Sequence, residues 1–74
     1  MNLMTDSPIH RLTIGQRHAL RVLFDCGWNY AEAAHRLQKS EDAVRRIIGR
    51  AVRRAKVPSS HHLAYWLRAE DEAA

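Results

Sequence analysis

Apolar residues recur at helical spacing in four separate stretches of the chain. The four sets are Ala19, Leu20, Leu23 and Phe24; Ala33, Ala34 and Leu37; Val44, Ile47, Ile48, Ala51, Val52 and Ala55; and Leu63, Tyr65, Trp66 and Leu67. Spacings of three and four residues place most members of each set on one face of a helix. No stretch alternates apolar and polar residues with a period of two. The pattern therefore predicts an all-α fold with four helices and no sheet.

Polar residues before three of these stretches mark where the helices begin. Thr13 is followed three residues later by Gln16, and Asn29 by Glu32, which is the spacing of a capping box. Ser40 stands in the middle of the helix-favouring run "AEAAHRLQKSEDAVRR" and precedes two acids that suit the positive end of a helix dipole. The run is therefore predicted to be two helices separated by a tight turn at residues 38–39.

The same signals divide the chain into three parts. Residues 1–11 show no clear period and are predicted to form a flexible N-terminal arm. Residues 12–69 hold the four helices, with Gly27 ending the first and Pro58 limiting the third. Residues 70–74 are predicted to be an acidic tail, because acids at the end of the fourth helix oppose its dipole.

Composition excludes several classes of protein. The chain has 74 residues, which suits one domain, and a single cysteine, so no disulfide can form within it. The five histidines lack the spacing of a zinc site, and no nucleophile–base pair or glycine-rich phosphate loop is present. We therefore expect no metal, no cofactor and no enzymatic activity. No membrane span or signal peptide is evident, so a cytoplasmic, nucleoid-associated protein is predicted.

Positive charge is concentrated on the third predicted helix. The net charge is +4, and residues 45–56 contain six basic side chains and no acid. Two short helices joined by a tight turn, the second one basic, are typical of a DNA-binding helix-turn-helix. The alternative for such a charge run is a solvated helix face. Double-stranded DNA is the predicted partner, with the third helix, about residues 41–56, in the major groove.

The sequence resembles the LuxR/GerE family of helix-turn-helix domains over residues 12–67. "LTIGQRHALRVL" is similar to the family's "LTxxExxVLxLL", and "GWNYAEAAHRLQKSEDAVRRIIGR" to its "GxSNKEIAxxLxISxxTVKxHxxx". "KVPSSHHLAYWL" is similar to the "GVxSRxxAVxxA" that begins the family's fourth helix. The resemblance implies a stand-alone, GerE-like regulator of transcription that binds specific DNA sequences.

The resemblance and the position on the third helix together nominate DNA contacts. The candidates for base contact are Asp42, Arg45, Arg46 and Ile47. The candidates for phosphate contact are Thr13, Arg36, Lys39, Ser40, Arg50, Arg53, Arg54 and Lys56. The presence of Thr13 is explained equally well by its role as a helix cap. Several of the basic residues are explained equally well by solubility.

The family commonly dimerises through its fourth helix, so the resemblance implies a homodimer contact there. The candidates are His61, His62, Tyr65, Trp66, Arg68 and Ala69. Tyr65 and Trp66 are about 100° apart on a helix, so only one of them can face the core. Two other interpretations remain open. The chain also resembles region four of sigma factors, which binds promoter DNA and RNA polymerase, or it is a small adaptor whose fourth helix docks on a larger regulator.

Overall fold

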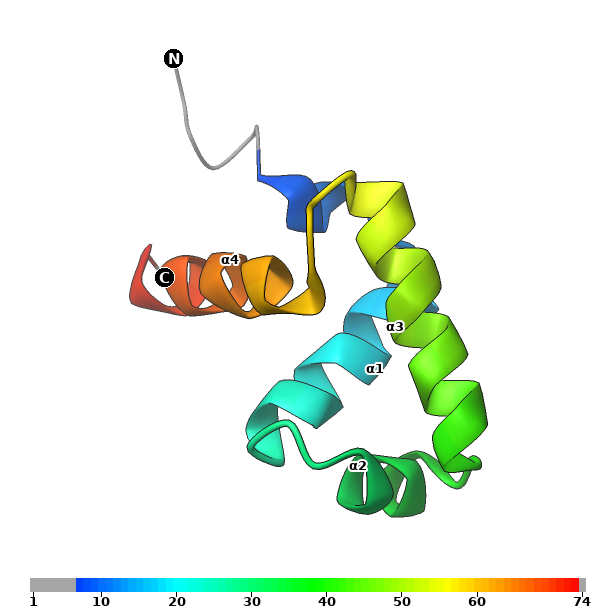
Figure 1. The fold of residues 1–74 in the computed structure, drawn as a ribbon. Helices are drawn as coiled ribbons and strands as arrows, with labels where there is room; N and C mark the ends of the chain where they lie inside the picture. Colours follow the sequence, from blue (N-terminus) through cyan, green and yellow to red (C-terminus); the bar gives the residue numbers. More distant parts are fainter. Residues whose placement is uncertain (1–6, 74) are drawn as a thin grey trace.

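A computed structural model describes residues 7–73 of the chain. Its elements, in chain order, are η1 (Pro8–Arg11), α1 (Ile14–Asp25), α2 (Tyr30–Leu37), α3 (Glu41–Ala55) and α4 (Ser60–Ala73) (Figure 1). Here η1 is a short 3-10 helix. No strand occurs in the described range. The predicted all-α fold with four α-helices is confirmed.

Side-chain caps begin three helices at the predicted residues. The Thr13 hydroxyl accepts a hydrogen bond from the Gln16 N–H at 3.1 Å, and the Gln16 side chain accepts one from the Thr13 N–H at 3.1 Å. The Asn29 side chain caps α2 by accepting from the third N–H of that helix at 3.0 Å. The Ser40 hydroxyl caps α3 in the same way at 3.1 Å. Ser40 therefore separates two helices, as predicted.

Left-handed residues turn the chain between helices. Gly27 follows α1 with φ 66°, as predicted, and Trp28 beside it is also left-handed at φ 69°. Gln38 ends α2 at φ 57°, and the Lys39 N–H donates to the Ala34 carbonyl at 3.0 Å. This arrangement satisfies a free carbonyl at the end of α2 and redirects the chain into α3 within three residues.

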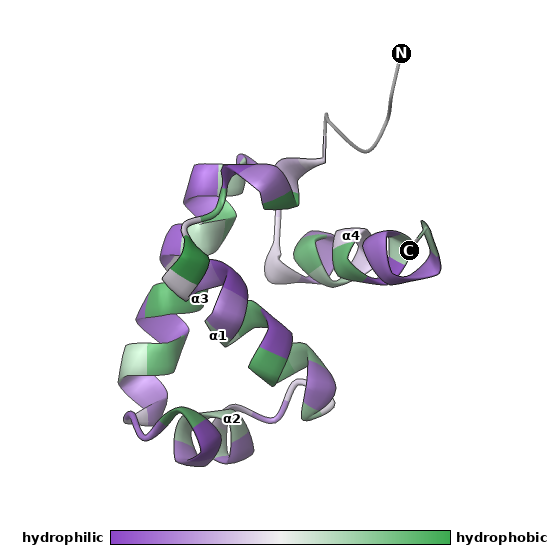
Figure 2. Cartoon of the chain, turned by 180° about the vertical axis from the view of Figure 1, so that it is seen from behind, coloured by the Kyte–Doolittle hydropathy of each residue, from purple (hydrophilic) through white to green (hydrophobic). Residues whose placement is uncertain are grey.

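The core lies between α1, α2 and α3, and α4 extends it toward η1. The buried apolar residues are Ile9, Ala19, Leu20, Leu23, Ala33, Ala34, Val44, Ile48, Ala51, Ala55, Leu63 and Leu67. Hydrophobic and hydrophilic positions recur along the helices in Figure 2, as expected for helices with one buried face. α2 and α4 lie on different sides of α1 (Figure 1).

Residues 8–11 of the predicted N-terminal arm form the short 3-10 helix η1. Ile9 has 0 % of its surface exposed and belongs to the core. The Arg11 guanidinium donates to the Ala55 carbonyl at 3.0 Å, while the Arg54 side chain donates to the Arg11 carbonyl. Burial of Ile9 and these two bonds to the end of α3 hold the segment in place. Residues 1–6 of the predicted arm lie outside the described residues.

Residues 70–73 of the predicted acidic tail are helical, because α4 continues through Ala73. Glu70 pairs with Arg17, and Asp71 accepts two hydrogen bonds from the Arg21 guanidinium, one of them at 3.0 Å. Pairing with α1 offsets the unfavourable position of these acids at the end of a helix. Residue 74 lies outside the described range.

Candidate nucleic-acid interface

One face of α3 points away from the core and carries its unpaired basic side chains. Asp42, Arg46, Gly49 and Arg53 follow one another at intervals of four, three and four residues, and all four are exposed. The opposite face holds the buried residues of α3, from Val44 to Ala55. The four exposed residues therefore form one stripe, which we call the outer stripe of α3.

Three arginines on or beside the outer stripe are free to bind an anion. Within residues 7–73, no carboxylate forms an ion pair with Arg46, Arg50 or Arg53. Asp42 lies in the first turn of α3, where its charge complements the positive end of the helix dipole. The surface thus combines one acceptor near the start of the helix with three forked donors farther along.

Arg45 is held in a different way from the other arginines of α3. Its guanidinium lies 4.3 Å from the centre of the Tyr30 ring and 3.7 Å from the Glu41 carboxylate. Tyr30 is the first residue of α2, so Arg45 extends along the flank of α3 that faces α2. Tyr30 is not among the contacts predicted from the sequence. An aromatic residue directly after a helix cap is its only local signal, and that signal does not reveal a partner in another helix.

Two other predicted contacts have roles in the fold. Arg54 donates to the Arg11 carbonyl and so ties η1 to α3. Ile47 is half-buried and packs against the core. Lys56 ends α3 in a left-handed conformation at φ 59° and is exposed. Of these three, only Lys56 presents a side chain without a described intramolecular partner.

A pocket brings together three of the predicted phosphate contacts from different elements. It is lined by Thr13, Gly15, Gln16, Lys39, Ile47 and Arg50. It therefore lies where the first turn of α1, the turn between α2 and α3, and the middle of α3 meet. The first N–H groups of a helix and two cationic side chains make this surface favourable for an anion.

The remaining phosphate candidates lie outside this pocket. Arg36 pairs with Glu32 at 3.1 Å on the exposed face of α2. The Ser40 hydroxyl accepts the capping hydrogen bond of α3, and its own proton stays available for donation. Neither residue lines the pocket at the start of α1.

The predicted dimer residues of α4 differ in accessibility. Tyr65 is 67 % exposed, whereas Trp66 packs against the core and meets the Tyr65 ring edge-on at 5.5 Å between centroids. This confirms that only one of the two faces inward. The His61 ring lies 6.1 Å from the Trp28 ring, and the His62 ring nitrogen is 3.1 Å from the Ser59 hydroxyl. Arg68 joins Tyr65 in lining a pocket beside Phe24, while Ala69 is half-buried.

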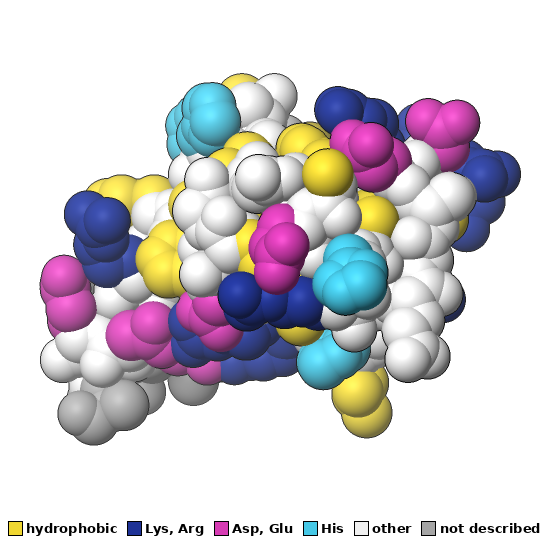
Figure 3. Space-filling model, turned by 90° about the horizontal axis from the view of Figure 1, so that it is seen from below, with side chains coloured by type: hydrophobic (Ala, Val, Ile, Leu, Met, Phe, Trp, Pro, Cys, Tyr) yellow, Lys and Arg dark blue, Asp and Glu magenta, His cyan; other side chains and the backbone are white. Residues whose placement is uncertain are grey.

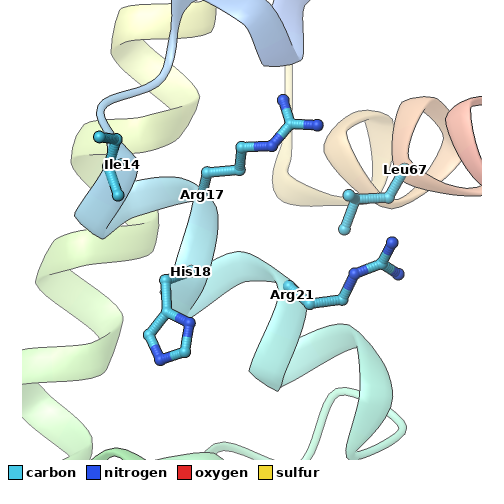
Figure 4. Close-up of a pocket in the computed structure, with 5 residues that line it drawn as sticks. All are labelled: Ile14, Arg17, His18, Arg21 and Leu67. Atoms are coloured by element: carbon cyan, nitrogen blue, oxygen red, sulfur yellow. The ribbon is translucent and has the colours of Figure 1, made fainter.

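A second charged surface joins α1 to α4. Arg17 and Arg21 extend from α1 toward α4 on either side of Leu67, whereas His18 points away (Figure 4). Seen from below, basic and acidic side chains lie directly beside one another on the molecular surface (Figure 3). Because these opposite charges compensate each other, this surface attracts a polyanion less strongly than the outer stripe of α3 does.

Two other kinds of feature, a metal-binding cluster and a membrane-spanning helix, are absent from the described residues. Within residues 7–73, no three His, Cys, Asp or Glu side chains are grouped closely enough to hold a metal ion. No helix in that range is both long and apolar enough to cross a membrane.

Comparison with known proteins identifies the helix-turn-helix. The family described as Sigma-70, region 4 matches residues 9–56, which is more than half of the chain. The match extends from η1 to the end of α3, and α4 lies beyond it. No curated protein and no solved structure matches the chain. The prediction of a helix-turn-helix DNA-binding region is confirmed, and the more specific LuxR/GerE assignment stays a prediction.

Proposed function

This chain belongs to the sigma-70 region 4 family, and we propose that it is a sequence-specific DNA-binding module of transcription without enzymatic activity. The observation that carries the proposal is the outer stripe of α3, where Arg46 and Arg53 face away from the core without an acidic partner in the described chain. In a helix-turn-helix, that face of the second helix enters the major groove. The protein then acts where chromosomal DNA lies, in the cytoplasm.

Base reading is assigned to the first half of α3. Arg46 can donate two hydrogen bonds to the edge of a guanine, and Asp42 can accept one from a cytosine amino group. Arg45 reaches the groove from the flank on which Tyr30 holds it. These contacts discriminate among sequences because each base pair presents a different set of donors and acceptors in the major groove.

Phosphate binding is assigned to the residues around that half of the helix. Lys39 and Arg50 line the pocket at the start of α1, so a phosphate there meets two cations and the positive end of a helix dipole. Arg53 and Lys56 lie farther along α3 and are placed to meet the DNA backbone. Such contacts fix the register of the protein on DNA and release counterions.

The proposal is tested by comparing two arginines with different assigned roles. A preferred duplex is first selected from a randomised library, and its affinity is measured against a scrambled duplex at several salt concentrations. Arg46→Ala should cost about 1–3 kcal/mol on the preferred duplex and relax the preference at one position. Arg50→Ala should weaken binding to both duplexes alike and lower the slope of log affinity against log salt by about one.

Both side chains are exposed, so the substitutions should leave thermal stability nearly unchanged, and unfolding curves serve as the control. If Arg46→Ala keeps the full ratio of preferred to scrambled binding, Arg46 is not a base reader. If neither variant loses affinity, α3 does not carry the DNA interface and the proposed function fails.

Two further roles are proposed on separate grounds. Membership of the family favours a promoter module that also contacts RNA polymerase. The resemblance to LuxR/GerE regulators and the 67 % exposure of Tyr65 favour a homodimer through α4. The two roles differ in stoichiometry on DNA and in the need for polymerase, and one experiment separates them below.

A further inference from the structure

Gly49 lies in the middle of α3, at a position where the fold does not require glycine. It is the ninth of the fifteen residues of Glu41–Ala55, and its backbone is regular helix. Glycine in a helix interior is among the least favourable residues, because it loses more backbone entropy than alanine and covers no backbone. A helix that begins with a cap and ends with a C-cap would be more stable with alanine at this position.

Neither conformation nor packing explains the glycine. Positive φ values occur at Gly27, Trp28, Gln38 and Lys56, and Gly49 is not among them. Apart from its own stretch of helix backbone, a Cβ atom at Gly49 would meet no heavy atom within 4 Å, so the rest of the protein leaves open space there. The missing side chain therefore benefits neither the backbone turn nor the approach of another helix.

The position of Gly49 suggests a function outside the fold. Gly49 lies on the outer stripe between Arg46 and Arg53, with Arg50 next to it, and all four residues are exposed. At 1.5 Å per residue, Gly49 lies about 12 Å along the helix from Glu41, which is comparable to the width of the major groove. The bare backbone at this point leaves a gap among three exposed arginines, in which there is space for the edge of a base pair to approach the helix.

We infer that Gly49 sets the depth at which α3 enters the major groove, by letting the edges of the base pairs approach the helix backbone. This inference rests on the proposed function, because it requires α3 to face DNA. A methyl group at this position would hold the helix away from the base pairs. The arginines on either side would then lose the short distances that hydrogen bonds to bases require.

If Gly49 has this role, replacing it with alanine should raise the stability of the fold and lower the affinity for DNA. Gly49→Ala should raise the midpoint of thermal unfolding by about 4–8 °C, because it improves helix propensity in a small domain. The same variant should bind its preferred duplex roughly 5- to 100-fold more weakly, which is the loss of one base contact. Gly49→Leu should also fold and should bind more weakly still, because leucine is a good helix former with a larger side chain.

His18→Ala is the matched control. His18 is exposed in the interior of α1 and points away from α4, and alanine there also improves helix propensity. It should raise the unfolding midpoint and leave DNA affinity unchanged. If His18→Ala weakens DNA binding as much as Gly49→Ala does, the loss follows from stabilisation alone and the inference is overturned.

The remaining outcomes separate this inference from the proposed function. If Arg46→Ala weakens binding and Gly49→Ala binds as tightly as the original chain, Gly49 has no role in docking and the proposed function stands. If Gly49→Ala lowers the unfolding midpoint, the glycine is structural and the inference is wrong. If no substitution on α3 changes DNA affinity, the proposed function itself fails.

Discussion

The five arginines of α3 differ in what surrounds each guanidinium. Arg54 is bonded to the Arg11 carbonyl, and Arg45 lies over Tyr30 with Glu41 beside it. Arg46, Arg50 and Arg53 have no acidic partner among residues 7–73. An arginine held by an aromatic ring has less side-chain entropy to lose on binding, whereas an unpaired one brings its full charge to DNA. The same residue type therefore serves the fold at Arg54, whereas the proposed function assigns base contact and phosphate attraction to the other arginines of the helix.

Tyr30 is predicted to position Arg45 for base contact. Tyr30→Leu removes the aromatic ring but keeps an apolar side chain, and it should cost about 0.5–1 kcal/mol of affinity for the preferred duplex. Tyr30→Phe keeps the ring and should bind like the original chain. The measurement is a double-mutant cycle with Arg45→Ala, in which the effect of Tyr30→Leu should disappear. An equal effect in both backgrounds would show that Tyr30 acts only through packing.

At the scale of elements, local signals were enough to predict most helix boundaries. Thr13, Asn29 and Ser40 cap α1, α2 and α3 as the sequence indicates, because a cap depends on residues only three positions apart. η1 and the end of α4 were not predictable in this way. Ile9 is ordered by a core built from distant residues, and Glu70 finds its partner 53 positions earlier in the chain.

The basic surface on α3 was predictable from the sequence, but the packing around it was not. The concentration of basic residues after a helix-turn-helix turn identified α3, since charge and periodicity are properties of the sequence. The pocket that joins Lys39 and Arg50 to Thr13 depends on how α1 packs against α3. The open space around Gly49 depends equally on the absence of any neighbouring element. Such features can be recognised only once the packing of the helices is known.

The C-terminal end of α4 is predicted to loosen from α1 at low pH and at high salt. The hydrogen bond from Arg21 lowers the pKa of Asp71 below its ordinary value of 3.8. A lowered pKa means that the pair contributes fully above about pH 5, and that the contribution falls as the pH drops below 4 and through the folded pKa. The Asp71 side chain is exposed, so salt should screen the pair as well.

Protection of the amides at the end of α4 against hydrogen exchange, corrected for intrinsic rates, measures this loosening. Protection should fall between pH 5 and about pH 3, and should fall at neutral pH when salt is raised to about 1 M. Asp71→Asn should lower protection at neutral pH and remove part of the pH dependence. Asp25→Asn is the control, because Asp25 lies 3.8 Å from Arg21 but belongs to α1 itself. Protection that is independent of both pH and salt would assign the attachment of α4 to its apolar contacts alone.

At the scale of the whole molecule, the region that matches the family is followed by one more helix, α4. The matched region 9–56 contains the helix-turn-helix and its basic face, and α4 follows it. Leu63 and Leu67 attach α4 to the core, and its ion pairs neutralise two arginines of α1. The positive charge that remains unpaired is thereby concentrated on α3. α4 also leaves Tyr65 exposed, on the surface where the proposed homodimer would form.

Paired binding on DNA is predicted to depend on Tyr65. Two copies joined through α4 would place their α3 helices in successive major grooves, about 34–36 Å apart or a multiple of that, on a nearly palindromic site. One helix buries little area compared with a standard interface of about 1,600 Å², so we expect little association without DNA. Light scattering should find two chains per duplex. Tyr65→Glu should reduce this to one, because a charge would be buried at the contact, while the monomer stays folded.

The same measurement with core RNA polymerase separates the two proposed roles. His18→Ala serves as the control and should leave the stoichiometry unchanged, since His18 is exposed on α1 and points away from α4. If one chain occupies the preferred duplex and Tyr65→Glu binds it as tightly as the original, the dimer is excluded. A polymerase-dependent gain in occupancy would then support the promoter module, because a second binding surface raises the local concentration of the chain at its site. Two chains per duplex with no gain from polymerase would support the paired regulator instead.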